Sequence, residues 1–438
     1  MKVILTLNAL YLAMTLSIAA QHGQTAPQPP AANQTTPEST PQLRQKTFEI
    51  VWRTVKDEHF DPNMGGVDWD KVREQYAPKV AAVRGDEEFY DLLNRMLGEL
   101  HQSHLAVIPP EVFAKDYANK SSTGGIGIDL RLIGERAVIT QLDSGSAAAR
   151  AGLRQGFIIK AIDGKAIDQI AERYNSRSVS DDLKRVSITG AILRAIHGQP
   201  GSPVRIAYLD ATDIQRDVTI LREQRKGEVL PAGGGLPPLF TEFESKILRG
   251  GIGYIRFNLF IPALYGRINS AIKSMTDAPG IIIDLRGNSG GFGEVVTAVA
   301  GLLVNKETVL VTCRRRKGAE EYIARPGKDA YDGPVVILID GMSLSSAEDF
   351  TAGLKESGRV TVVGERSPGD DLEADTRKLP TGAKLMYAIG ECATVKGTAI
   401  EGHGVIPDRE IALDRAMLLK GGDAQLEQAI TSIQRQSH

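Results

Sequence analysis

The sequence predicts an α/β protein with a helical N-terminal region, an inserted β-rich module and a C-terminal core. Apolar stripes at helical spacing occupy residues 43–117, short β-type runs with glycine turns occupy 118–224, and apolar strands alternate with helical segments over 240–438. The chain has 438 residues, of which 42% are hydrophobic and 24% charged, as in an ordinary globular protein. A formal net charge of -2 gives no basic field, so nucleic acid and anionic membranes are not expected partners.

Residues 1–20 have the pattern of an export signal. Lys2 supplies the positive start, residues 3–18 are mostly apolar, and Ser17-Ile18-Ala19 fits a cleavage site. The apolar run is short for a membrane span, which needs ~20 residues, so we expect a cleaved signal and a periplasmic or secreted protein. Residues 21–42 are rich in Gln, Pro, Thr and Ala and are expected to form a disordered linker.

The N-terminal region is expected to contain three helices. Thr40 and Pro41 fit the N-cap and first position of the first helix, and Asp68 and Asp86 open the second and third. The apolar stripe of the third helix ends at His101-Gln102-Ser103-His104, so these side chains should lie at a helix exit.

The β-rich module begins with GGIGIDL, residues 124–130. A strand-like AVITQL, a short run of small residues ending in Ala-Gly-Leu, a further strand and an Asp-Gly turn follow. Residues 225–239 contain LPAGGGLPP and are expected to be a linker into the core of residues 240–438.

Three polar stretches interrupt the apolar strands of the core. DLRGNSGG, residues 284–291, has glycines that let backbone N–H groups point into a cavity, as an oxyanion requires. GMSLSSAEDF, residues 341–350, follows the run 335–339 and reads as a strand–turn–helix that presents a serine hydroxyl at a helix N-terminus. EGHGVIPD, residues 401–408, is the third.

In this order, the motifs DWDKVREQYAPKV, MLGELHQSH, DLRGNSGG, SLSSAE and EGHGVIPD, with the β-rich module among them, resemble the tail-specific or C-terminal-processing serine peptidases (family S41). Within that family they resemble the tricorn-core-like branch, from about Phe48 to the C-terminus. The resemblance implies a β/α (crotonase-like) protease core, a PDZ domain at 118–224, and an exported serine endopeptidase acting on polypeptides. In such PDZ domains a loop donates backbone N–H groups to a peptide's C-terminal carboxylate, and Gly125, Ile126, Gly127 and Ile128 match it.

The resemblance also implies which serine is the nucleophile. In the family it stands three residues before a glutamate, which here is Glu348, so the nucleophile is expected to be Ser345. The alternatives are Ser343, which can cap the helix, and Ser346, whose backbone N–H can face the oxyanion. A second oxyanion donor is expected from Gly290 or Gly291.

The general base is expected to be a histidine. The family's better-known branch uses a lysine where this chain has Asp370, and an aspartate is a poor base for a serine hydroxyl. The other branch uses a Ser-His pair with a distant glutamate, which Ser103, His104 and Glu401 match. We therefore expect His104 as base and acid, oriented by Ser103, which Glu401 contacts.

Several alternatives stay open at this point. His101 and His403 are alternative bases, and a catalytically inactive peptide-binding relative is the alternative function, since the lysine is missing. Asp284 and Arg286 are expected to form a structural salt bridge. Cys313 and Cys392 permit one disulfide, although we expect them to pack as free thiols. No metal or organic cofactor is expected, because no ligand spacing is present.

Overall fold

The computed structural model describes four stretches of the chain, residues 39–113, 123–175, 179–231 and 238–436. The predicted signal peptide (1–20) and most of the predicted linker (21–42) lie outside these residues. Among the described residues, no helix is long and apolar enough to cross a membrane.

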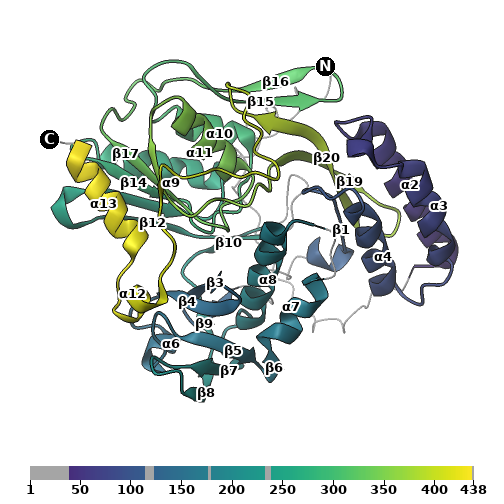
Figure 1. Ribbon diagram of the computed structural model, residues 1–438, viewed down its shortest axis with the longest axis horizontal. Helices are drawn as coiled ribbons and strands as arrows, with labels where there is room; N and C mark the ends of the chain where they lie inside the picture. Colours follow the sequence, from purple (N-terminus) through teal and green to yellow (C-terminus); the bar gives the residue numbers. More distant parts are fainter. Residues whose placement is uncertain (1–38, 114–122, 176–178, 232–237, 437–438) are drawn as a thin grey trace, which may run out of the picture. The chain divides into compact units, whose positions relative to one another are not determined.

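A six-stranded sheet forms the C-terminal core (Figure 1). Its order is β12 (Phe243–Ile247), β13 (Gly253–Phe257), β14 (Ile281–Asp284), β17 (Val335–Ile339), β18 (Thr361–Gly364) and β21 (Arg409–Glu410). Only β12 is antiparallel to its neighbour, and the other pairs are parallel. The carboxyl ends of β14 and β17 therefore meet at one edge, where residues 284–291 and 340–345 follow them.

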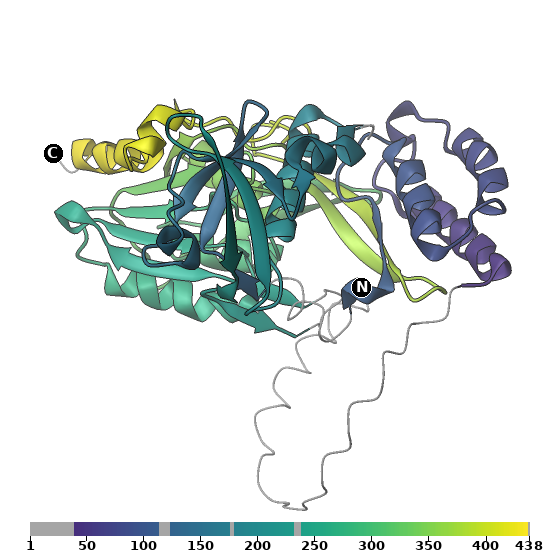
Figure 2. The same cartoon turned by 90° about the horizontal axis from the view of Figure 1, so that it is seen from below.

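Both faces of this sheet are covered, which explains why its strands are apolar on both sides. Ile281 and Ile283 pack with α9 (Pro262–Ser274), α10 (Gly293–Ala300) and α11 (Ser346–Glu356). Ile282 belongs to the hydrophobic cluster on the other face, together with residues of α13 (Ala424–Gln436). Figure 2 shows α13, in yellow, on one side of the sheet.

An antiparallel sheet and three helices form a second layer. Its strands are β1 (Ala106–Ile108), β15 (Thr308–Arg315), β16 (Ala319–Ala324), β19 (Leu372–Lys378) and β20 (Lys384–Ala393). The helices α2 (Pro41–Glu58), α3 (Trp69–Val80) and α4 (Asp86–Gly98) share a core with β20. The predicted N-cap is confirmed, because the Thr40 side chain accepts a hydrogen bond from Leu43 N–H.

Two expectations about this layer are wrong. The linker predicted to end at residue 42 is shorter, because Ser39 is already buried and its N–H donates to Asp86. Cys313 and Cys392 are not free thiols: they stand opposite each other in the register of β15 and β20 and form a disulfide.

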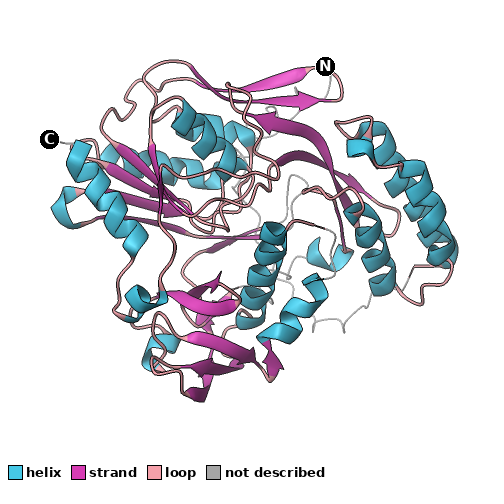
Figure 3. Cartoon of the chain, in the orientation of Figure 1, coloured by secondary structure: helices cyan, strands magenta, loops and turns pink. Residues whose placement is uncertain are grey.

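The inserted module has its own sheet and its own hydrophobic core (Figure 3). The sheet contains β3 (Ile128–Ile133), β4 (Arg136–Leu142), β5 (Ile158–Ile162), β6 (Lys165–Ala166), β7 (Pro203–Leu209) and β8 (Gln215–Leu221). Its helices are α6 (Ala147–Arg150), α7 (Ile167–Asn175) and α8 (Asp181–Ile196), and α8 packs against β3.

Short elements complete the chain. They are β2 (Gly124–Gly125) paired with β9 (Glu223–Gln224), β10 (Glu228–Leu230) paired with β11 (Leu239–Thr241), α12 (Arg415–Leu419), and the 3-10 turns η1 (Met64–Gly66), η2 (Pro110–Phe113) and η3 (Arg249–Gly251). The expected linker 225–239 is therefore partly a β-hairpin, because its residues 228–230 pair with 239–241.

Candidate active site

The turn after β17 is closed by Ser343. This side chain is fully buried, and its Oγ donates to the Leu285 carbonyl (2.8 Å) and accepts from Asp340 N–H (3.0 Å). The first residue of α11 is Ser346, so Ser343 is two residues too early to cap the helix. Ser343 thus joins the β14 and β17 turns and has no access to a substrate.

Ser345 stands between this turn and α11 in a strained conformation. Its φ is 54° and its ψ is -128°, a region that non-glycine residues rarely adopt and that costs about 1–3 kcal/mol. Its N–H donates to the Asp370 carbonyl (2.8 Å) and to Glu348 Oε2 (3.0 Å). Ser345 is the N-cap of α11 and forms a capping box with Glu348. A strained strand-to-helix turn of this kind presents a hydroxyl for reaction.

Glu348 ties the turn to the segment that follows β18. It is buried, and its Oε1 accepts from Ser367 Oγ (2.7 Å) and Gly369 N–H (2.8 Å). Its Oε2 accepts from the N–H groups of Ser345 and Asp370, each at 3.0 Å. Burial raises the pKa of Glu348 and the hydrogen bonds to its oxygens lower it, and the balance is a pKa of about 8.

His104 lies where three distant segments meet. Its Nδ1 is 2.8 Å from Ser103 Oγ and 3.1 Å from Asp370 Oδ1. Ser103 Oγ donates to Glu401 Oε2 (2.8 Å), and Ser103 N–H donates to Glu401 Oε1 (2.9 Å). Because the Ser103 proton goes to Glu401, both groups at Nδ1 are acceptors. Nδ1 therefore carries the ring proton, and Nε2 is left as the basic nitrogen.

The charges around His104 favour its protonated form. Burial lowers the pKa of His104, but the hydrogen bond and charge of Asp370 raise it, and the charges of Glu401 and Glu348 add to this. The net effect places the pKa of His104 above the usual histidine value. His104 can act as a base only above that raised pKa.

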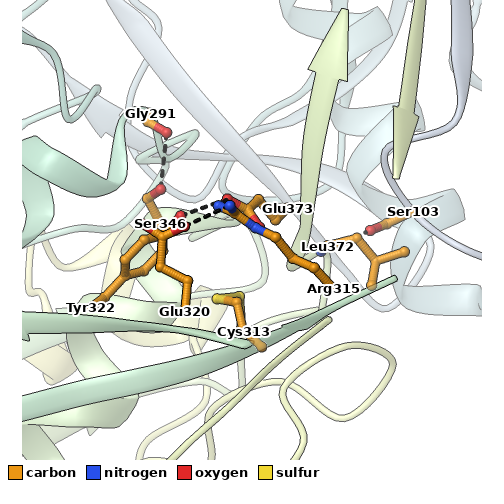
Figure 4. Close-up of a disulfide and its surroundings, with 10 residues drawn as sticks. Ser103, Gly291, Cys313, Arg315, Glu320, Tyr322, Ser346, Leu372 and Glu373 are labelled. Carbon is orange, nitrogen blue, oxygen red and sulfur yellow. Dashed lines mark hydrogen bonds and ion pairs between the residues drawn. A yellow bond between two sulfur atoms is a disulfide. The ribbon is translucent and has the colours of Figure 1, made fainter. Parts of the chain in front are cut away.

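Gly290 and Gly291 differ in what their N–H groups do. Gly290 N–H donates to Asn288 Oδ1 (2.9 Å), whereas Gly291 N–H has no acceptor among the described residues. Ser346 Oγ donates to the Gly291 carbonyl (2.9 Å), the dashed contact in Figure 4. A Cβ on Gly290 would lie 2.8 Å from the Cβ of Ser345, so only glycine fits beside that serine.

The remaining expected residues are placed as follows. His101 and His403 have exposed side chains, and the contacts at His104 Nδ1 involve neither of them. Arg286 and Asp284 form the expected salt bridge, at 2.6 Å between Nη2 and Oδ2. From the sequence, Asp370 is recognisable only as the residue that replaces lysine, and its contact with His104 is visible only in the structure.

The glycine loop of the inserted module leads directly into β3. Gly127 has a φ of 78°, and a Cβ there would lie 2.3 Å from the Ser146 Cβ. The carbonyls of Ile126 and Gly127 accept from Ala148 N–H (3.0 Å) and Asp143 N–H (2.9 Å), while Gly125 belongs to β2 and Ile128 begins β3. The N–H groups of Ile126 and Gly127 have no acceptor in the described part of the chain.

Comparisons with known proteins bear on the family and the fold of the chain. The model of peptidase family S41 matches residues 251–411, and the model of the tricorn protease C1 domain matches residues 41–98. A carboxyl-terminal-processing protease of Synechocystis sp. is 25% identical over 395 residues, which cover 88% of this chain and 86% of that protein.

Two solved structures share the fold. The photosystem II D1 C-terminal processing protease aligns with a TM-score of 0.56 and 22% identity, over 87% of this chain and 98% of that one. Mature CPAF aligns with a TM-score of 0.62 and 12% identity, over 90% and 96%. At these identities the structural likeness concerns the fold.

Proposed function

The chain belongs to peptidase family S41 and is a serine-type peptidase, and on this premise we propose that Ser345 is its nucleophile and His104 its general base. The observation that carries the proposal is that side chains from different segments of the chain meet at His104. Ser103 and Asp370 hold its Nδ1, and the main-chain carbonyl of Asp370 also holds the N–H of Ser345. One residue therefore contacts both proposed reacting groups.

The proposed reaction follows from these roles. Ser345 Oγ attacks the scissile carbonyl carbon while its proton passes to His104 Nε2. The oxyanion that forms accepts hydrogen bonds from Ser346 N–H and Gly291 N–H, the donor preferred over Gly290, whose N–H is engaged. His104 then gives the proton to the leaving amine, and a water molecule releases the acyl group by the same steps in reverse order.

Labelling with a fluorophosphonate tests the nucleophile. We expect one adduct on Ser345, and we expect Ser345→Ala to abolish both labelling and peptide hydrolysis. Ser346→Ala is the matched control, because its backbone N–H remains and only the bond to Gly291 is lost. An adduct on Ser346, or activity in Ser345→Ala, would contradict the assignment.

We also propose that the module at 118–224 is a PDZ domain that captures substrates by their C-termini. The support is the loop Gly125–Ile128, whose N–H groups at Ile126 and Gly127 are unoccupied among the described residues, and its position before β3. Because β3 is the outermost strand of its sheet, an extended peptide can pair with its free edge.

In this conformation side chains occupy that edge of β3. Leu130 N–H donates to Asp129 Oδ1 (2.9 Å), and the Leu130 carbonyl accepts from Arg131 Nη1 (2.7 Å). Further along the strand, the Leu132 carbonyl accepts from Arg185 Nη2 (2.6 Å). A bound peptide strand must displace these contacts before it can pair.

Binding to full-length Ser345→Ala protein tests capture without cleavage. We expect a peptide with a free C-terminus to bind more tightly than its amidated twin, and Arg185→Ala to tighten binding a few-fold. Lys184→Ala, at the neighbouring position on α8, is the control. Equal affinity for the two peptides would argue against carboxylate capture.

Export of the enzyme is also part of the proposal. It is supported by the pattern of residues 1–20 and by the Cys313–Cys392 disulfide, since such bonds persist in oxidising compartments. N-terminal sequencing of the mature protein from the extracellular or periplasmic fraction tests it, with a start at or next to residue 20 expected.

A further inference from the structure

Two buried carboxyl groups face each other beside the proposed site. Asp349 lies in the first turn of α11, and Asp371 follows Asp370 in the chain; they are 5% and 2% exposed. One oxygen of each lies within 4.8 Å of the other and of Cys392 Sγ. Asp349 Oδ1 and both oxygens of Asp371 have no donor among the described residues. A buried carboxylate without donors is unfavourable, so this pair needs an explanation.

A bound cation does not explain the pair. The Cys392 sulfur is held in the disulfide and offers no thiolate, and two carboxylate oxygens are fewer ligands than divalent cations take. The charged and titratable neighbours are mostly acidic as well: Glu348, Asp370, Glu373, Glu401, Tyr322 and His104. Arg315 is paired with Glu373 and Glu320 instead (Figure 4).

A proton held between the two groups accounts for these buried oxygens without donors. One group is then a carboxylic acid that donates to the other, as in carboxyl dyads elsewhere. Burial raises the pKa of Asp349 to about 7, and burial together with the charge of Asp349 raises the pKa of Asp371 well above the usual range.

We propose that Asp349 and Asp371 share one proton, and that this O–H···O bond positions the Ser345 turn against the segment that carries Asp370. The inference rests on the proposed function, in which Ser345 and His104 react. Asp349 and Asp371 are both positioning residues, because they act through their neighbours and not on the substrate.

The backbone shows how the pair acts on the site. Asp349 N–H donates to the Ser345 carbonyl (3.2 Å), so Asp349 lies one helical turn beyond the nucleophile. Asp371 N–H donates to Glu401 Oε2 (2.9 Å), the oxygen that also accepts from Ser103 Oγ. The shared proton therefore links the nucleophile side of the site to the side that orients His104. Its loss to solvent at alkaline pH leaves two facing carboxylates that repel each other across this link.

The pH dependence of Asp349→Asn and Asp371→Asn tests the inference. An asparagine keeps the shape and donates from its amide without titrating, so it imitates the protonated partner. In the wild type we expect kcat to fall at alkaline pH. In each variant we expect this alkaline limb of the pH–rate profile to shift to higher pH by about one unit or to disappear. Asp277→Asn, at an exposed position, is the matched control and should follow the wild type.

Stability gives a readout that does not need catalysis. The folded protein holds the shared proton more tightly than the unfolded chain, so wild-type stability falls as the pH rises from the unfolded-state pKa of aspartate, ~3.9, through the raised pKa values of the folded protein, about 7 for Asp349 and higher for Asp371. The Tm of each asparagine variant should depend less on pH over that range. Asp349→Ala, which removes the bond, should lose about tenfold in kcat at neutral pH while asparagine retains most of it.

Infrared spectroscopy of the wild type covers the case in which a variant does not fold. A carbonyl band of a protonated carboxylic acid should be present at neutral pH and disappear as the alkaline limb is crossed. Alkaline limbs and Tm slopes unchanged in both asparagine variants, or absence of the band, would overturn the proposal. If the fluorophosphonate adduct instead maps away from Ser345, the proposed function fails while the Tm slopes and the band still test the proton.

Discussion

The molecule contains two acidic clusters that differ in how their negative charge is neutralised. In the arginine-paired cluster, Asp129, Asp284 and Asp340 contact Arg131, Arg256 and Arg286 where the inserted module meets the core. In the histidine cluster, Glu348, Asp349, Asp370, Asp371 and Glu401 surround His104. Both clusters border the turns that carry the proposed site, since Asp340 Oδ1 accepts from Gly287 N–H (3.0 Å) and from Met342 N–H (2.9 Å).

The pKa shifts follow from this difference. Burial raises the pKa of Asp284, but the charge and hydrogen bonds of Arg286 lower it further, so Asp284 stays ionised at all ordinary pH values. Burial raises the pKa of Asp349 and Asp371, and no arginine opposes this effect. A buried acid paired with guanidinium groups stays ionised over the ordinary pH range. Buried acids with one histidine as their nearby cation have raised pKa values, so they hold protons and respond to pH.

Removing the cation of the histidine cluster should have the largest effect. His104→Ala should lower kcat on the order of 10²–10⁴-fold, the usual loss for a positioned acid–base group. Lys355→Ala and Lys378→Ala are the controls and should leave kcat nearly unchanged. Steady-state kinetics on a peptide substrate measures this. Full activity in His104→Ala, or loss of activity in either lysine variant, would indicate that a lysine is the base.

Removing an anion from the arginine-paired cluster should affect stability first. Asp284→Ala leaves Arg286 with Asp423 as its remaining carboxylate, and Tyr254 loses its acceptor. We expect a loss of about 3 kcal/mol in the free energy of unfolding, measured by urea denaturation. The active fraction should keep the pH–rate profile of the wild type. A shifted acid limb would show that the two clusters are electrostatically coupled.

Neutralising Asp370 should change both the rate and the pH dependence. Because Asp370 raises the pKa of His104, Asp370→Asn should move the acid limb of kcat/KM to lower pH. The same change weakens the hold on Nδ1, and kcat should fall on the order of 10²-fold. Asp375→Asn, exposed on β19, serves as the control. An acid limb that stays in place would remove Asp370 from the account of His104.

Neutralising Glu401 should have the smallest effect of the four. Glu401 contacts Ser103 and not His104, so Glu401→Gln should cost about tenfold in kcat, with a smaller downward shift of the acid limb than Asp370→Asn gives. The two pH–rate profiles measured side by side decide this order. A larger loss in Glu401→Gln would mean that Ser103 and Glu401, not Asp370, set the orientation of His104.

Short motifs in the sequence predict the α/β core, the membership of family S41 and the candidate site residues. Ser103, His104 and Glu401 were recognisable because each stands in a short collinear motif. The contact of Asp370 with His104 was not, because it depends on where two loops from different layers meet. The same holds for the Asp349–Asp371 pair, whose members read as ordinary acidic residues in a helix and a loop.

The errors come from strand pairing and from contacts between turns, which composition and motifs do not show. The strand-like segments around Cys313 and Cys392 were visible, but not the register that sets the two cysteines opposite each other. The linker expected at 225–239 was recognised by composition, which cannot show that residues 228–230 pair with 239–241. Ser343 looked like a helix cap because its burial depends on the neighbouring β14 turn.

The bond between Ser103 and Glu401 joins residues 298 positions apart in the chain. Since synthesis proceeds from the N-terminus, the orienting half of the proposed site exists only after nearly all of the chain has been made. A chain that is still being made therefore has the proposed nucleophile but lacks the contact that orients the proposed base. The proposed site can therefore form only when folding of the chain is nearly complete.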